Sequence, residues 1–286
     1  MAVNARHRIA LVGAGRVGSA VAALLQRAGH EVVSVASRSP ASAARAAALL
    51  GAPVVPLDAP DPNADLVLIG AADDAIATVA RALAPALSPG TIACHFAGAR
   101  GLAPLGALGA RAAALHPVQA CPTIEAGLAH LPGSAWGVTV ADDLWDWAKT
   151  LIEDDLDGRA VRLAEEQRPA WHAAAVMTAN GTAALLAHAE AVLGRLGVAD
   201  PLGVLGPLAA GAIANARVGG GGGATLTGPV VRGEDDTLRR HRAALTPAED
   251  DAYVAVARLV LAAARAAGRM DDGVAGRIEA ALEASA

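Results

Sequence analysis

The chain has 286 residues, of which 54% are hydrophobic and 18% are charged, and its formal net charge is −5. The length allows two domains, and the composition supports a sizeable core and excludes an intrinsically disordered chain. The acidic balance argues against nucleic acid or an anionic membrane as a partner.

Short apolar runs alternate with alanine-rich helical stretches from Arg8 to about Leu163. This alternation is the pattern of a mostly parallel, doubly wound α/β sheet with crossover helices. The predicted strands are Ile9–Val12, Glu31–Ala36, Leu66–Gly70, Thr91–His95, Ala112–His116, Gly137–Val140 and Arg159–Leu163. The predicted helices between them are Val17–Ala28, Pro40–Leu50, Asp74–Leu83 and Asp142–Ile152.

After Leu163 the sequence predicts only helices. Thr246-Pro-Ala-Glu249 is a capping box with proline at the first helical position, so a helix begins there and closes at Gly268. The glycine run Gly219–Gly223 is interpreted as a flexible connector, because no strand precedes it. Four other helices are predicted. The first starts near Glu165–Pro169 and runs to Leu196, the second covers about Pro201–Arg217, the third covers about Asp236–Leu245, and the last ends the chain.

A glycine motif directly follows the first predicted strand and opens the first predicted helix. Gly13 would make the tight turn, Gly15 would let a pyrophosphate reach the backbone, and Gly18 would let the helix pack on the strand. The free N–H groups of the helix N-terminus favour a bound pyrophosphate. The residues expected to contact a cofactor here are Gly13, Ala14, Gly15, Arg16, Val17 and Gly18. The motif predicts a dinucleotide-binding Rossmann domain over residues 1–163, followed by an all-α domain for substrate binding or dimerisation over residues 164–286.

The end of the second predicted strand indicates which dinucleotide binds. An NAD site normally has a carboxylate at this position to hold the ribose 2′-hydroxyl. Here Ser37, Arg38 and Ser39 follow Ala36, which offers a guanidinium and two hydroxyls to a 2′-phosphate. We therefore expect NADP(H) as the cofactor. The alternative for Ser39 is that it caps the helix that begins at Pro40.

Six segments resemble one family over nearly the full length of the chain. They are Gly13–Gly18, Ala72–Ile76, His95–Gly98, Leu115–Gln119, Trp171–Asn180 and Leu226–Gly233. The chain resembles Rossmann-like proteins that carry the C-terminal domain of unknown function numbered 2520, distant relatives of pyrroline-carboxylate reductase, ketopantoate reductase and the hydroxyacid dehydrogenases. This resemblance implies an NADP-linked oxidoreductase. Two departures stand out: His-Phe-Ala-Gly replaces the usual His-Thr-Ser-Gly, and Glu234 replaces the usual Asp.

Several polar side chains fall at or just past predicted strand ends, where ligands of open α/β sheets lie. Ala72, Asp73 and His95 are the candidates for contacts to the cofactor. Helix capping is the alternative for Asp73, and buttressing of a loop is the alternative for His95. His116 is a candidate substrate contact, or fixes the turn before Pro117.

The long helix of the second domain carries the candidate catalytic residues. Hydroxyacid dehydrogenases of this wider group place a lysine four residues before an asparagine on this helix, but Val176 occupies that place before Asn180. His172 lies a further four residues back on the same helix face, so His172 is the candidate proton donor, with Asn180 as a hydrogen-bond donor to the substrate heteroatom. The alternative for His172 is a core histidine.

Arg232 follows Gly228-Pro229 in a turn and could clamp a carboxylate with both arms of its guanidinium. The alternative is a solvated surface arginine. We therefore expect an NADPH-dependent reductase of a small C=O or C=N compound, a ketopantoate-like 2-keto acid first and a cyclic imine second. A non-catalytic NADP(H) sensor or scaffold is the competing hypothesis.

Two features of the sequence predict a cytoplasmic location. Cys94 and Cys121 are too few for a disulfide framework in a chain of this size. The apolar stretch before the glycine motif is too short for a secretory signal, and no apolar run spans a membrane uninterrupted. No metal is expected, and the alanine-rich helices make a homodimer plausible, because small residues permit close helix contact.

Overall fold

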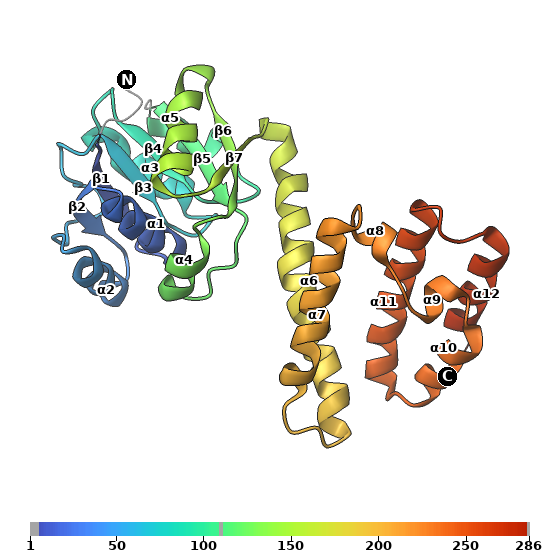
Figure 1. The fold of residues 1–286 in the computed structure, drawn as a ribbon. Helices are drawn as coiled ribbons and strands as arrows, with labels where there is room; N and C mark the ends of the chain where they lie inside the picture. The colour runs from blue at the N-terminus through green and yellow to red at the C-terminus, as the bar shows by residue number, and fades with distance from the viewer. Residues whose placement is uncertain (1–5, 109–110, 285–286) are drawn as a thin grey trace. The chain divides into compact units, whose positions relative to one another are not determined.

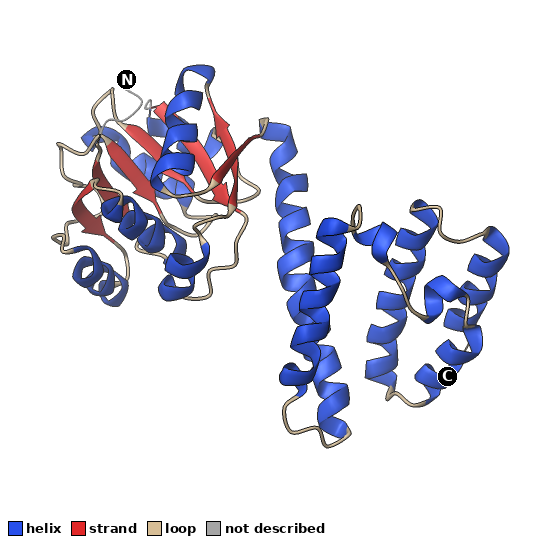
Figure 2. Ribbon diagram, viewed as in Figure 1, coloured by secondary structure: helices blue, strands red, loops and turns tan. Residues whose placement is uncertain are grey.

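The computed structural model describes residues 6–108 and 111–284. The chain divides into two compact units, residues 1–179 and 180–286. The first unit contains a seven-stranded sheet with helices around it, and the described residues of the second form helices and loops (Figures 1 and 2). The predicted domain boundary at residue 163 follows the last strand closely, but it stays a prediction.

The sheet has the strand order β2-β1-β3-β4-β5-β6-β7. Strands β1 to β5 run parallel, β6 runs antiparallel to β5, and β7 runs parallel to β6. The predicted α/β class with a mostly parallel sheet is confirmed, and the reversed β6–β7 pair is the departure from a parallel sheet. The strands are β1 (Arg8–Val12), β2 (Glu31–Ala36), β3 (Leu66–Ile69), β4 (Ile92–His95), β5 (Arg111–Pro117), β6 (Ala135–Val140) and β7 (Arg159–Arg162).

The helices of the first unit cover both faces of the sheet. One hydrophobic core lies under α1, α2, α4 and α5, and the other lies under α3. Strands β1, β3 and β4 are buried along almost their whole length, as expected of strands covered on both faces. These helices are α1 (Arg16–Arg27), α2 (Pro40–Leu50), α3 (Ile76–Leu83), α4 (Ile124–His130) and α5 (Trp145–Thr150).

One helix prediction in this unit needs correction, and one helix was missed. The helix predicted over Asp142–Ile152 is a 3₁₀ turn at Asp142–Leu144, then α5, then a π-helical turn at Leu151–Asp155. Helix α4 was not predicted, because seven residues with an internal glycine are too short to show a helical period.

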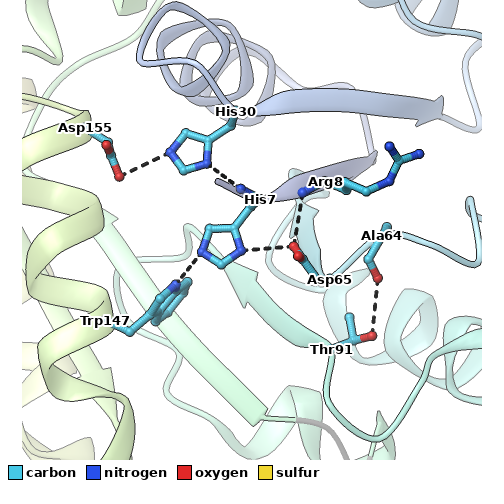
Figure 3. A network of polar contacts seen from close by, with 8 residues as sticks. All are labelled: His7, Arg8, His30, Ala64, Asp65, Thr91, Trp147 and Asp155. Carbon is cyan, nitrogen blue, oxygen red and sulfur yellow. Dashed lines mark hydrogen bonds and ion pairs between the residues drawn. The ribbon is translucent and has the colours of Figure 1, made fainter. Parts of the chain in front are cut away.

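A buried polar network joins the start of β1 to distant parts of the first unit (Figure 3). His7 Nδ1 lies 3.0 Å from a carboxylate oxygen of Asp65, and His7 Nε2 accepts a hydrogen bond of 2.9 Å from Trp147 Nε1. The His30 ring stacks on His7, accepts a hydrogen bond from its backbone N–H and lies 3.2 Å from Asp155. Each histidine accepts one N–H at one ring nitrogen and faces a carboxylate at the other, so the network fixes the orientation of both rings and the nitrogen that acts as acceptor.

The helices of the second unit follow the predicted order, and the predicted all-α region is confirmed. Thr246 and Glu249 form the predicted capping box, with a 2.8 Å hydrogen bond from the Thr246 N–H to the Glu249 carboxylate. The prediction that Gly219–Gly223 is only a flexible connector is partly wrong, because a single helical turn begins at Gly222. The helices are α6 (Arg168–Arg195), which continues from the first unit, α7 (Pro201–Val218), α8 (Gly222–Thr225), α9 (Pro229–Arg232), α10 (Asp235–Ala243), α11 (Pro247–Ala266) and α12 (Asp272–Glu283). Within the described residues, no helix combines the length and apolar character needed to cross a membrane.

Candidate cofactor and substrate site

Four glycines interlock where β1 turns into α1. Gly13 has φ +81°, a backbone conformation that favours glycine, and a Cβ there would lie 2.8 Å from the Ala71 nitrogen. A Cβ on Gly18 would lie 2.9 Å from the Gly70 Cα, and a Cβ on Gly15 would collide with the Gly70 carbonyl oxygen. The turn therefore packs on the end of β3, and Gly70 is a member of the motif that the sequence alone does not reveal.

The N-terminus of α1 fits a bound pyrophosphate. Gly15 is the N-cap of this helix in an extended conformation, and no side chain caps the first turn. The N–H groups of that turn are thus left for a ligand, and the helix dipole favours an anion there. Arg16 donates a hydrogen bond of 3.1 Å to the Pro122 carbonyl, so its guanidinium is held toward the loop after β5. The site lies beside β1, where the strand order reverses and ligands of open sheets bind.

The segment Ser37–Ser39 follows β2, the strand next to β1. The Gly13 N–H donates to the Ala36 carbonyl at 2.8 Å, which joins the glycine turn to the end of β2. Ser39 caps α2 by accepting a 3.3 Å hydrogen bond from the Ser42 N–H. The capping alternative for Ser39 is therefore present in the structure. Arg38 is exposed beside it, and its contact to a 2′-phosphate stays a prediction.

Ala72 and Asp73 lie exposed in the turn between β3 and α3. The N-cap of α3 is Ala75, and no side chain caps it, so the capping alternative for Asp73 is absent here. The Asp73 carboxylate is close enough to His95 and Arg168 to act on the pKa of both side chains.

His95 is fully buried at the end of β4 and holds the loop that follows. Its Nδ1 accepts a hydrogen bond of 3.1 Å from the Ala97 N–H, and its Nε2 donates to the Gly101 carbonyl at 2.8 Å. Burial lowers the pKa of this imidazole, and the hydrogen bond to Gly101 opposes that shift. Both ring nitrogens are thus used in buttressing the loop, so a side-chain contact to the cofactor would require one of these bonds to break.

His116 and His172 come together at the end of β5. Their ring centroids are 5.2 Å apart in an edge-to-face arrangement. His172 Nδ1 is buried and, among the described residues, has no hydrogen-bond partner. It packs on Gly98, where a Cβ would overlap the imidazole. Burial lowers the pKa of His116 to about 4, with smaller contributions from His172 and Arg168.

Arg168 lies beside the candidate site, but the sequence alone does not predict it as a site residue. It starts α6 and is fully buried, although exposed arginines are the rule. Its guanidinium donates to the carbonyl oxygens of Ala97, Ala114 and Gly137 and to the Thr139 hydroxyl, at 2.6 to 3.4 Å. Burial lowers its pKa to about 10, against the effect of the nearby carboxylates, so the side chain remains charged at neutral pH. The arginine thereby ties the start of α6 to the loop after β4 and to strands β5 and β6.

Two other predicted site residues belong to the second unit. Asn180 is on α6, eight positions after His172 in the sequence. The role of Asn180 as a donor to the substrate stays a prediction. Arg232 lies in the short helix α9 and forms a two-pronged ion pair with Glu234, at 2.6 and 3.2 Å. A substrate carboxylate would have to displace Glu234.

Two family comparisons match most of the chain. Residues 2–117 match the family of Rossmann-like domains, which agrees with the glycine turn and the sheet. Residues 134–260 match the domain of unknown function DUF2520. The chain is therefore a Rossmann-like protein with a DUF2520 domain, and the predicted family resemblance is confirmed. None of the curated proteins matches it.

Solved structures share this fold at low sequence identity. A candidate NADP oxidoreductase from Bacteroides fragilis is 23% identical, with a TM-score of 0.78 over 89% of this chain and 98% of that one. A reductive aminase from Aspergillus terreus, bound to NADPH and ethyl-5-oxohexanoate, is 18% identical, with a TM-score of 0.63 over 96% and 99%. A pyrroline-5-carboxylate reductase from Coxiella burnetii is 17% identical, with a TM-score of 0.58 over 97% of both chains. At these identities the likeness establishes the fold.

Proposed function

We propose that this protein is an NADPH-dependent reductase of a small C=O or C=N compound. The observation that carries this function is the uncapped N-terminus of α1, cradled by interlocked glycines, on the same sheet as the His116–His172 pair. The cradle binds the pyrophosphate, and the histidines lie at the carboxyl end of β5, where a substrate of such a sheet binds. The names of the proteins that share the fold support the same chemistry.

Three residues of the first unit have different roles in the proposed reduction. Reduced nicotinamide supplies a hydride when it is bound. His172 gives a proton to the substrate heteroatom, as a general acid does, and regains it from water. His116 contacts the substrate beside it. Arg168 holds the start of α6 against the sheet, which positions His172.

The test is a screen of 2-keto acids and cyclic imines for oxidation of NADPH by the full chain. Turnover of any compound supports the reductase. A chain that binds NADPH tightly and oxidises it with none of these compounds contradicts the reductase and favours the sensor or scaffold.

We expect Arg38→Ala to weaken NADP(H) binding selectively. The lost guanidinium would contact only the 2′-phosphate, so NAD(H) affinity should be unchanged while NADP(H) affinity falls about tenfold or more. Titration calorimetry with both cofactors measures the difference. Arg45→Ala, an exposed arginine on α2, is the control. Equal affinities of the unaltered chain for NADP(H) and NAD(H) would overturn the preference.

We propose that the chain is a homodimer that buries α7. None of the 18 residues of α7 is buried, although the helix carries large apolar side chains. Ile213, Leu208 and Val218 are 58%, 72% and 87% exposed. A monomer rarely exposes so many apolar side chains together, and a second copy of the same helix would cover them.

If α7 forms the dimer interface, one charged side chain on this helix should dissociate the dimer. Leu208→Glu should convert the dimer to a monomer, because the carboxylate would be buried without a partner in the interface. Analytical ultracentrifugation measures the mass. Leu259→Glu, at another exposed apolar position on α11, is the comparison. A chain that is monomeric before any substitution removes the proposal.

A further inference from the structure

We propose that Trp171 holds His116 as a neutral hydrogen-bond donor to a substrate oxygen, and that the chain therefore reduces carbonyl compounds in preference to protonated imines. This inference rests on the proposed function and narrows its substrate from C=O or C=N to C=O. Three observations carry it: the Trp171 hydrogen bond to His116, the glycine at position 137 opposite His116 on β6, and the charge of Arg168.

Trp171 determines which nitrogen of His116 carries the proton. The indole Nε1 lies 3.2 Å from His116 Nδ1. An indole N–H can only donate, so Nδ1 must accept and the proton of the neutral ring is on Nε2. The His116 side chain is partly exposed, and its Nε2 makes no hydrogen bond with any residue in 6–108 or 111–284. An N–H donor of fixed direction is thus left for a ligand.

The backbone opposite His116 is shaped to admit the indole. Gly137 is the direct partner of His116 in the antiparallel β5–β6 pair. A Cβ at Gly137 would lie 2.6 Å from Trp171 Nε1 and 2.7 Å from Leu163 Cδ1. Glycine therefore lets Trp171 lie against the strand and reach His116, which explains a glycine inside a strand that is otherwise buried.

The charge that acts on His116 is positive. Arg168 donates to the Gly137 carbonyl and to the Ala114 carbonyl, so its guanidinium lies beside β5 and β6, and its charge lowers the pKa of His116. The carboxylates that face Arg168 are those of Asp73 and Glu165, and neither forms an ion pair with it within the described residues. Glu165 instead accepts the Leu102 N–H at 2.7 Å.

This environment distinguishes a carbonyl from a protonated imine. The carbonyl carbon accepts a hydride from reduced nicotinamide, the C=O π pair moves to oxygen, and the resulting negative charge is stabilised by the His116 N–H and the field of Arg168. A proton from His172 then completes the alcohol, and oxidised nicotinamide is the other product. A protonated imine has no lone pair to accept the His116 hydrogen bond, and its positive charge is repelled by Arg168.

Nitrogen NMR of the full chain with ¹⁵N-labelled histidine tests the tautomer without any substrate. We expect His116 to carry its proton on Nε2 and to stay neutral from about pH 8 to about pH 5. Trp171→Phe should raise the pKa of His116, because the lost donor had favoured the unprotonated Nδ1. Trp147→Phe is a matched control, since Trp147 donates to His7 in the distant network (Figure 3). It should change the His7 signals and leave those of His116 as they are. A proton on His116 Nδ1 would overturn the proposal.

Turnover of matched pairs tests the substrate. Each pair is a cyclic ketone and the cyclic imine of the same ring size, assayed with NADPH. We expect kcat/KM to favour the ketone, and the ketone-to-imine ratio to fall about tenfold in Trp171→Phe and about 10²-fold in His116→Phe, on the scale of a lost oxyanion donor. Trp147→Phe should leave the ratio unchanged. A preference for the imine overturns the inference and keeps the reductase. Turnover of no pair contradicts the reductase and the carbonyl preference together, while the NMR result decides the tautomer of His116 independently.

Discussion

Replacing Arg168 with alanine is expected to lower the free energy of unfolding of the first unit by about 3–5 kcal/mol. The substitution leaves four buried acceptors without their donor, at about 1–3 kcal/mol for each that stays dry, and opens a cavity at the start of α6. Removal of a buried charge offsets part of this loss. Arg168→Met keeps most of the volume, so we expect about half of the alanine effect.

Urea denaturation followed by tryptophan fluorescence measures this effect. All four tryptophans lie in the first unit, at positions 136, 145, 147 and 171, so the signal reports that unit. Arg162→Ala is the control, because Arg162 is an exposed arginine near the same sheet edge, and its loss should cost under about 0.5 kcal/mol. If the Arg168 variants have the same free energy of unfolding as the unaltered chain, the hydrogen bonds of the buried guanidinium do not stabilise the first unit.

His172→Ala is expected to lower kcat about 10²-fold or more while NADPH binding is kept, once a substrate is known. This is the usual scale for a lost general acid. Asn180→Ala should lower kcat less. If the two residues act as a unit, the double variant should lose little beyond His172→Ala. Stopped-flow measurement of NADPH oxidation gives kcat, and fluorescence titration gives the cofactor affinity.

Two further variants separate catalysis from packing, because His172 lies against Gly98 and His116. His172→Gln keeps a polar side chain of similar length, and should preserve the fold while remaining inactive. His188→Ala, a histidine on the second-unit part of α6, should keep full kcat. A His172→Ala chain that melts early but turns over at the original rate would make His172 a core residue and leave His116 as the polar contact.

The elements that the sequence predicts to the residue are those whose signals are local. Helix α2 is one, since Ser39 caps it, Pro40 opens it and Gly51, with φ +63°, ends it. The same is true of β2, a mostly apolar run between the turn at Gly29 and Ser37. In contrast, the helix predicted over Asp142–Ile152 changes its hydrogen-bond pattern twice, and no residue type marks where it does so.

The candidate site is less visible in the sequence because its geometry depends on distant contacts. Arg168 resembles an ordinary charge at a helix start, and the carbonyl of Ala97 that it binds lies 71 residues away. Trp171 resembles a core aromatic until the strand opposite His116 is placed beside it. Glycines that interrupt apolar runs are the available signal: Gly70, Gly98 and Gly137 each lie where another residue approaches the backbone.

The hydrogen bond between His7 and Trp147 has a consequence for how the chain folds during synthesis. The two side chains are separated by 140 residues. The first strand therefore leaves the ribosome long before the tryptophan that donates to the His7 imidazole, and until then only water can satisfy that ring nitrogen. Closing a loop of this length is slow compared with local helix formation. The nascent first unit should consequently resist proteases only after α5 has emerged, and a chain truncated before Trp147 should remain a substrate for them.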